Sequence, residues 1–246
     1  MQADFMSGRM IKLLELKDVT AGYGEKLVLN GVSLVVGEGE IVGLVGPNGS
    51  GKSTVLKTIY SILPVQSGEV IFKKQPIHNR KTSQNVEDGI AYIPQGSKVF
   101  DKLTVLENLE MGGVLLRDEK ILKERIAGIH EKFPQLKEFS GTIAGKLSGG
   151  QRQLVGLCIG LIMHPSFILI DEPSIGLAPS LVQQTMELIQ NTRDSFQTSV
   201  LVVEQNVRAM LTIADRVYLL KLGRITHEET RVDANTETRL REIFLT

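Results

Sequence analysis

The sequence predicts an α/β protein with a parallel-sheet core, an antiparallel β portion near its N-terminal end and a helical subdomain inserted into the core. Apolar runs typical of strands alternate with helix-like segments, which indicates a parallel sheet covered by helices. The stretch 96–165 interrupts this alternation with helical segments alone. A glycine-rich turn, GPNGSGKS at residues 46–53, joins an apolar strand to a helix.

The expected strands are short runs of apolar or alternating residues bounded by turn residues. Before the helical stretch they are residues 11–20, 27–36, 40–46, 69–73 and 90–93. After it they are residues 167–171, 198–204 and the hairpin 216–229, which turns at Leu222-Gly223. A turn at Gly22-Tyr23-Gly24 separates the first two strands, so we expect them to form the antiparallel portion.

The expected helices are residues 54–63, 104–116, 119–133, 179–193 and the apolar run that follows LSGGQ at 147–151. A short charged helix is expected at the end of the chain. We therefore expect a flexible tail, 1–10, and a single domain, 11–246. The core of this domain comprises 11–95 and 166–230, its helical subdomain is 96–165 and its C-terminal tail helix is 231–246.

Composition excludes several classes of protein. Hydrophobic residues make up 42% of the 246 residues, which fits a packed globular domain. Lys+Arg and Asp+Glu number 28 each, so the chain lacks the basic field of a nucleic-acid-binding protein, and no nucleic-acid partner is expected. The single cysteine, Cys158, excludes an internal disulfide and a four-cysteine zinc site. Its apolar neighbours indicate a buried thiol in a reducing cytoplasm.

Two segments resemble targeting or membrane segments without being so. Residues 1–10 contain an acid and no apolar core, so they do not read as a signal peptide. Residues 153–170 carry no charge, but His164-Pro165-Ser166 interrupts them and Asp171-Glu172 follows. A helix, a turn and a buried strand explain this run better than a membrane span of about 20 residues.

The turn at residues 46–53 has the pattern of a phosphate-binding loop between a strand and a helix. Its glycines let backbone N–H groups converge on an anion, and the helix N-terminus adds its dipole. Lys52 is expected to reach the outer phosphates, and the Ser53 hydroxyl to bind Mg²⁺. The residues expected to contact the ligand are Gly46, Pro47, Asn48, Gly49, Ser50, Gly51, Lys52, Ser53 and Thr54.

Two adjacent carboxylates follow the strand FILID and begin the sequence DEPS. The carboxyl end of a buried strand is where α/β sheets place their ligands. Asp171 is expected to bind Mg²⁺. Glu172 is expected to act as the general base, or to orient the attacking water.

The sequence LSGGQ at 147–151 indicates a second anion-binding turn. Ser148 is a natural N-cap for the following helix, and Gly149 and Gly150 expose N–H groups at the positive end of its dipole. Taken alone, Ser-Gly-Gly before a helix is usually only a cap.

Together, the phosphate loop, DEPS and LSGGQ resemble the nucleotide-binding subunits of ABC transporters over about residues 11–230. The resemblance implies a P-loop ATPase core that uses ATP and Mg²⁺. It also implies that two subunits meet head to tail, with each ATP between the P-loop of one subunit and LSGGQ of the other. Residues Ser148, Gly149, Gly150 and Gln151 would then complete the site of a neighbouring subunit.

The same resemblance assigns further positions. Tyr23 matches the aromatic residue that stacks on adenine, and Gln95 matches the glutamine that contacts Mg²⁺ and water and relays to the membrane subunits. Gln205 stands where the family has a switch histidine. A glutamine can hydrogen-bond a γ-phosphate but carries no positive charge. The loop 174–177 matches the one that faces the partner subunit, and Ala178 replaces the usual aspartate at its end.

Three segments narrow the resemblance to the smaller ATPase subunit of branched-chain amino-acid importers: 96–113, 172–182 and 202–225. This implies a cytoplasmic subunit, peripheral on the inner face of the membrane, with transmembrane permease subunits and a second ATPase subunit as partners. The second ATPase is either a copy of this chain or a different one, and a substrate-binding protein is an indirect partner. Phe100, Leu103, Val105 and Leu109 either line the groove for a permease helix or belong to the core.

Several alternatives remain open at this level. A urea or amide importer subunit would look nearly the same, and an exporter or lipid-extraction ATPase would differ by retaining the switch histidine. A soluble ABC ATPase of DNA repair, chromosome organisation or translation usually adds a coiled coil, a zinc element or a second cassette. The sequence contains one cassette and one cysteine, which disfavours that last class.

Overall fold

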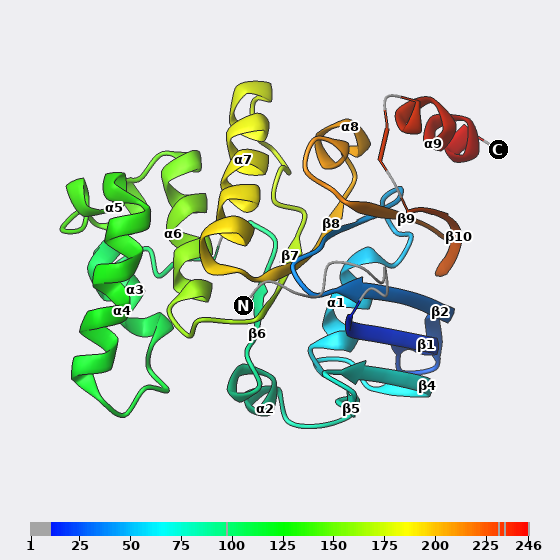
Figure 1. Ribbon diagram of the computed structural model, residues 1–246, viewed down its shortest axis with the longest axis horizontal. Helices are drawn as coiled ribbons and strands as arrows, with labels where there is room; N and C mark the ends of the chain where they lie inside the picture. Colours follow the sequence, from blue (N-terminus) through cyan, green and yellow to red (C-terminus); the bar gives the residue numbers. More distant parts are fainter. Residues whose placement is uncertain (1–10, 97, 231, 234, 246) are drawn as a thin grey trace, which may run out of the picture.

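The structure is a computed structural model that describes residues 11–96, 98–230, 232–233 and 235–245 (Figure 1). The expected tail 1–10 lies outside the described residues. Figure 1 shows the helices from α3 (Val105–Gly112) to α6 (Gly149–Leu161) gathered at one end of the molecule. The strands β1 (Lys12–Tyr23), β2 (Lys26–Gly37) and β4 (Val65–Phe72) lie at the other end. A second sheet lies between these two ends and carries the site described below.

The central sheet has six strands in the order β10-β9-β3-β8-β7-β6. Its members are β3 (Ile41–Val45), β6 (Ile90–Ile93), β7 (Phe167–Asp171), β8 (Ser199–Glu204), β9 (Arg216–Lys221) and β10 (Arg224–Glu229). All neighbours pair in parallel except β9 and β10, which form the expected hairpin. Because β3, β7 and β8 are buried along their whole length, they appear in the sequence as continuous apolar runs.

Alternation along these strands divides the core into two clusters. On β7, Phe167 and Leu169 point to one face, towards α1 (Lys52–Ile59) and the antiparallel sheet. Ile168 and Ile170 point to the other face. There they pack with α6 (Gly149–Leu161), α7 (Pro179–Phe196) and α8 (Val207–Leu211). The period of two therefore buries both faces of the sheet.

The antiparallel sheet has the order β2-β1-β4-β5. Its strands are β1 (Lys12–Tyr23), β2 (Lys26–Gly37), β4 (Val65–Phe72) and β5 (Gln75–Pro76). β1 pairs with both β2 and β4, and the turn between β1 and β2 leaves Tyr23 half-exposed at the strand end. This sheet packs over α1 and so covers the first face of the central sheet.

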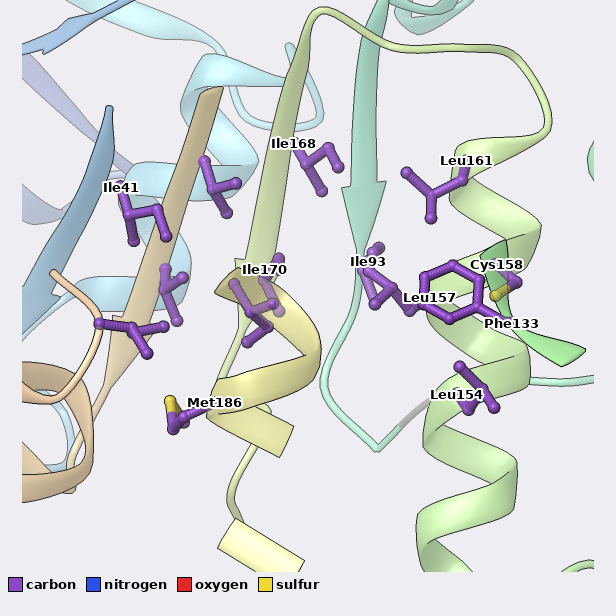
Figure 2. Packing of buried hydrophobic residues seen from close by; sticks show 14 of the residues in the cluster. Ile41, Ile93, Phe133, Leu154, Leu157, Cys158, Leu161, Ile168, Ile170 and Met186 are labelled. Atoms are coloured by element: carbon purple, nitrogen blue, oxygen red, sulfur yellow. The ribbon is translucent and has the colours of Figure 1, made fainter. Parts of the chain in front are cut away.

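The helical subdomain contains α3 (Val105–Gly112), α4 (Glu119–Lys132), α5 (Pro134–Glu138) and α6. Figure 2 shows how it joins the sheet: Ile93 of β6 and Ile168 of β7 face Leu157 and Leu161 of α6. Cys158 is buried in the same cluster, and burial raises the pKa of its thiol well above the ordinary value. The thiol is therefore a packing group, as its apolar neighbours predict.

The uncharged run 153–170 folds as the sequence predicts. α6 ends at Leu161, His164 takes a left-handed φ of 51° in the turn, and β7 begins at Phe167. Within the described ranges, no helix is long and apolar enough to cross a membrane.

Several sequence-based expectations need correction. For Val105 and Leu109, the core is the alternative that holds: both are fully buried in α3, so they do not line a surface groove. The helix expected at 104–116 ends at Gly112, and α7 runs on to Phe196. The sequence reading also missed α2 (Thr82–Glu87), α5 and α8, each of only five or six residues. Such short helices contain too few turns to show a hydrophobic period.

Two glycines in the helical subdomain offer a matched test of this packing. A Cβ at Gly112 would lie 2.5 Å from the carbonyl oxygen of Ile159, whereas a Cβ at Gly128 on α4 meets nothing within 4 Å. We expect Gly112→Ala to destabilise the fold by about 1–3 kcal/mol because α3 and α6 must separate. Gly128→Ala should instead stabilise it by about 0.5–1 kcal/mol through helix propensity. The shifts of the thermal unfolding midpoint measure both, and shifts of equal sign would contradict the packing.

Candidate functional site

The turn between β3 and α1 is shaped by its glycines. A Cβ at Gly46 would lie 2.3 Å from the carbonyl oxygen of Leu220, so a larger residue does not fit there. Gly49 and Gly51 have φ angles of 77° and 107°, in the left-handed region that glycine adopts without strain. α1 begins directly after Gly51. A glycine turn that leads into a helix N-terminus is an arrangement that binds phosphate.

The buried side chain of Lys52 lies back over this turn. Its ammonium donates to the carbonyl oxygens of Gly46 and Pro47 at 3.0 and 3.1 Å and forms an ion pair with Glu172 Oε1 at 3.1 Å. The neighbouring Ser50 hydroxyl is buried and has no hydrogen-bond partner among the residues that the structure describes. A buried cation beside an unpartnered hydroxyl suits an anionic ligand.

Asp171, the last residue of β7, lies next to the start of α1. Its Oδ1 accepts a hydrogen bond from the Ser53 hydroxyl at 2.8 Å, and its Oδ2 accepts one from the Tyr92 hydroxyl at 3.1 Å. Burial raises the pKa of this carboxyl above its ordinary value, the two hydrogen bonds oppose that rise, and the charge of Glu172 adds to it. Burial, followed by the charge of Asp171, raises the pKa of Tyr92, so its phenol stays a donor.

Glu172 is buried and held in an unusual conformation. Its φ of 45° lies in the left-handed region, which a non-glycine residue rarely adopts, and its N–H donates to the carbonyl oxygen of Val203 at 3.0 Å. Besides the ion pair with Lys52, its carboxylate accepts a hydrogen bond from Gln95 Nε2 at 3.0 Å. The backbone therefore aims this carboxylate at the phosphate turn rather than along the strand direction.

The side-chain oxygens at this sheet edge are suitable ligands for Mg²⁺. Ser53, Asp171 and Gln95 present a hydroxyl, a carboxylate and an amide oxygen, the hard oxygen ligands that Mg²⁺ prefers. The described part of the chain has no group of three or more His, Cys, Asp or Glu residues that could hold a metal ion. A Mg²⁺ ion held at this edge would complete its coordination with water or phosphate oxygens.

Most of the remaining predicted residues lie at the surface. Tyr23 is 49% exposed, and its hydroxyl accepts a hydrogen bond from Lys57 Nζ at 3.5 Å. Gln205 follows β8 and is exposed, and its side chain makes no hydrogen bond to another described residue. Asn48 is exposed, whereas Thr54 is buried in the first turn of α1.

LSGGQ forms the predicted helix start but not a joint site with the phosphate turn. Ser148 is the N-cap of α6: its hydroxyl accepts from Gln151 N–H at 3.4 Å, and its own N–H donates to Gln151 Oε1 at 3.0 Å. Gly149 and Gly150 follow in the first turn of the helix. Across the described ranges, these four residues make no hydrogen bond or ion pair with residues 46–54.

Two residues of the site escaped the sequence reading. Tyr92 pairs with Leu169 in the parallel register of β6 and β7, and only that register brings its hydroxyl to Asp171. Glu204, the last residue of β8, is 2% exposed and binds three backbone N–H groups. A signal for it was present in the sequence, because an acid that ends an apolar strand repeats the position of Asp171.

The sequence is similar to a known protein family and to several transport proteins. The family profile described as ABC transporter matches residues 29–175. The chain is 38% identical to the high-affinity branched-chain amino acid transport ATP-binding protein BraG of Pseudomonas aeruginosa, over 95% of this chain and 99% of the relative. It is 37% identical to the probable branched-chain amino acid transport ATP-binding protein LivF of Archaeoglobus fulgidus, over 89% and 92%. It is 31% identical to the lipopolysaccharide export system ATP-binding protein LptB of Escherichia coli, over 94% and 96%.

Solved structures agree with these relatives. The ADP conformation of MJ1267, an ATP-binding cassette of an ABC transporter, is similar with a TM-score of 0.85 and 27% identity, over 96% of this chain and 99% of that one. A dimeric post-hydrolysis state of the cassette MJ0796, bound to ADP and Pi, has a TM-score of 0.76 and 27% identity, over 90% and 100%. The chain therefore belongs to the ABC transporter family and is an ATP-binding subunit of the ATPase type that energises transport.

Proposed function

We propose that this subunit hydrolyses ATP to drive an importer of branched-chain amino acids. The observation that carries the hydrolytic role is the contact of the P-loop with the end of β7, where Lys52 meets Glu172 and Ser53 meets Asp171. The class of substrate rests on the relatives, since BraG and LivF are named for branched-chain amino acid transport.

In the proposed reaction, the phosphates of ATP bind the N–H groups of the P-loop and the N-terminus of α1. Lys52 exchanges Glu172 for phosphate oxygens. Glu172 is then released from its ion pair and accepts a proton from the water that attacks the γ-phosphorus, while Gln95 holds the carboxylate in place. The bond between that phosphorus and the β–γ bridging oxygen breaks, and ADP and phosphate leave. Mg²⁺, held by Ser53, Asp171 and Gln95, supplies charge neutralisation at the outer phosphates when it is bound.

The remaining predicted contacts complete the nucleotide site. Tyr23 stacks on the adenine, and Gln205 hydrogen-bonds the γ-phosphate in place of a histidine. Residues 148–151 bind the phosphates held by a second ATPase subunit, which is consistent with their lack of contact with the P-loop of their own chain. The dimer of the similar cassette MJ0796 supports pairing of this kind.

We further propose that the helical subdomain, 96–165 within the domain 11–246, binds the transmembrane permease subunits. Six large apolar side chains of this region are exposed: Phe100, Leu106, Met111, Val114, Leu115 and Ile121. The buried Asn108 of α3 binds both the N–H and the C=O of Phe100, at 2.7 and 3.1 Å, so the ring is presented on a fixed backbone. The subunit would then lie on the inner face of the membrane, and a substrate-binding protein would act on it indirectly through the permease.

An export function is the second candidate, because the chain is also 31% identical to LptB. The lower identity and the glutamine at position 205 favour import. Uptake of labelled leucine and of labelled urea by cells with and without the gene would distinguish an importer of branched-chain amino acids from an importer of urea or amides. Unchanged uptake of both, with loss of an envelope lipid, would favour export.

The first prediction concerns Glu172. Replacement by glutamine removes the proton acceptor but leaves the P-loop intact, so we expect ATP turnover to fall by about 10²–10⁴-fold while ATP binding survives. With Mg²⁺ excluded, light scattering should show ATP-dependent pairing of Glu172→Gln subunits, or of this subunit with a different ATPase partner.

The matched control is Ser148→Arg in the Glu172→Gln background. A charged side chain at this N-cap should abolish pairing without changing ATP binding by the single subunit, because LSGGQ belongs to the neighbour's site. Pairing that survives Ser148→Arg would contradict the role of LSGGQ, and near-normal turnover of Glu172→Gln would contradict the role of the carboxylate.

The second prediction concerns Phe100, which is 50% exposed. Phe100→Glu should abolish transport in cells while the purified subunit still binds ATP, because burying a charge in an apolar contact with the permease is costly. Ile62→Glu, at a side chain of similar exposure outside the helical subdomain, serves as the control and should transport normally. Normal uptake by Phe100→Glu would disprove the docking role of this residue.

A further inference from the structure

Glu204 joins two loops that follow neighbouring strands of the central sheet. Its Oε1 accepts the N–H of Ser174 at 2.8 Å, in the loop after β7. Its Oε2 accepts the N–H groups of Gln205 and Asn206 at 2.8 and 2.9 Å, in the loop after β8. The side chain is 2% exposed, so these three donors replace the water that a carboxylate would otherwise bind.

The first of these loops carries the strained Glu172. Ser174 lies two residues after it, and the N–H of Glu172 itself donates to Val203, the residue before Glu204. The segment 172–174 is therefore fastened to the end of β8 at two points. A left-handed φ at a non-glycine residue persists only where the surroundings determine it more than once.

The second loop carries Gln205. Its backbone position depends on Glu204 Oε2, since the N–H groups of Gln205 and Asn206 both donate to that oxygen. One carboxylate thus sets the place of two residues, Glu172 and Gln205, that follow different strands. The Glu204 carboxylate is too deeply buried, and too fully hydrogen-bonded, to contact a nucleotide itself.

We propose that Glu204 is a positioning residue for ATP hydrolysis, which keeps the loops of Glu172 and Gln205 in a fixed relation. The inference rests on the proposed roles of those two residues. It requires a carboxylate, because a glutamine offers one acceptor oxygen and an NH₂ group that donates. A glutamine can therefore serve one loop only, and its NH₂ group would face an N–H group of the other.

The loop after β7 keeps other contacts without Glu204. The buried Gln153 of α6 donates through its amide to the carbonyl oxygen of Pro173, and its own oxygen accepts from the Thr185 hydroxyl at 3.1 Å. The N–H of Glu172 also keeps its bond to Val203. We therefore expect Glu204→Gln to fold, with one loop displaced rather than lost.

The test compares Glu204→Gln with the unaltered full chain. We expect kcat for ATP hydrolysis to fall by about 10–100-fold, since small misplacement of a catalytic group has effects of that order. The KM for ATP should change by less than about 2-fold, because the P-loop is untouched. Amide hydrogen exchange should accelerate in peptides covering 173–177 or 205–207 and stay unchanged in the strand residues 199–203.

Glu69→Gln is the matched control, because it makes the same chemical change at an exposed carboxylate of β4. It should leave kcat, KM and exchange unchanged. A kcat of Glu204→Gln within about 2-fold of that of the unaltered chain would overturn the proposal, because misplacement of a catalytic group should lower kcat much further. The proposal would also be overturned if the fall in kcat came with weaker ATP binding and a lower thermal unfolding midpoint. Glu204 would then serve stability alone.

Turnover of the two variants, Glu172→Gln and Glu204→Gln, together with the exchange measurement, distinguishes failure of this proposal from failure of the proposed function. If Glu172→Gln retains turnover, the assignment of the general base fails whatever Glu204 does. If Glu172→Gln is inactive, Glu204→Gln is active and exchange at 173–177 and 205–207 is unchanged, only the positioning role of Glu204 fails.

Discussion

Parallel pairing of β3, β8 and β7 is the constraint on which the site depends. These strands are buried on both faces, so their apolar side chains leave no room for polar groups until each strand ends. Because they run in the same direction, all three ends lie at one edge. Lys52, Asp171 and Glu204 follow or end these strands, and packing on the two sheet faces holds them at that edge.

Burial at that edge makes the charges depend on one another. An ammonium and a carboxylate removed from water are costly unless paired, and removal of one partner from a buried pair costs about 3–5 kcal/mol. The ion pair of Lys52 with Glu172 and the hydrogen bonds of Asp171 to Ser53 and Tyr92 meet this requirement within the protein. A phosphate that binds Lys52 must compensate for the broken pair, and in doing so it releases the carboxylate that the proposed reaction needs.

Sequence reasoning identified the parts of this site that local patterns encode. Lys52 and Ser53 belong to a motif set by backbone geometry, while Asp171 ends and Glu172 follows a strand that is otherwise apolar. Tyr92 was out of reach, because its role depends on the register of β6 against β7. The same limit explains Val105 and Leu109: both fit an apolar helix face, but which face is covered depends on how α3 packs on α6. Glu204 was visible as an acid at a strand end, yet its two loops meet only in three dimensions.

The capping geometry of LSGGQ bears on why a second phosphate turn would be built without charge. In the capping box of α6, the Ser148 oxygen and Gln151 Oε1 both act as acceptors. The donors that remain for an anion are the Ser148 O–H, the glycine N–H groups and the Gln151 amide, and the helix dipole adds to them. Such neutral donors contribute less than a lysine, whose charge-assisted bonds are roughly twice as strong. Under the proposed pairing, the P-loop with Lys52 holds the nucleotide, and LSGGQ closes on it weakly enough to separate once the γ-phosphate has gone.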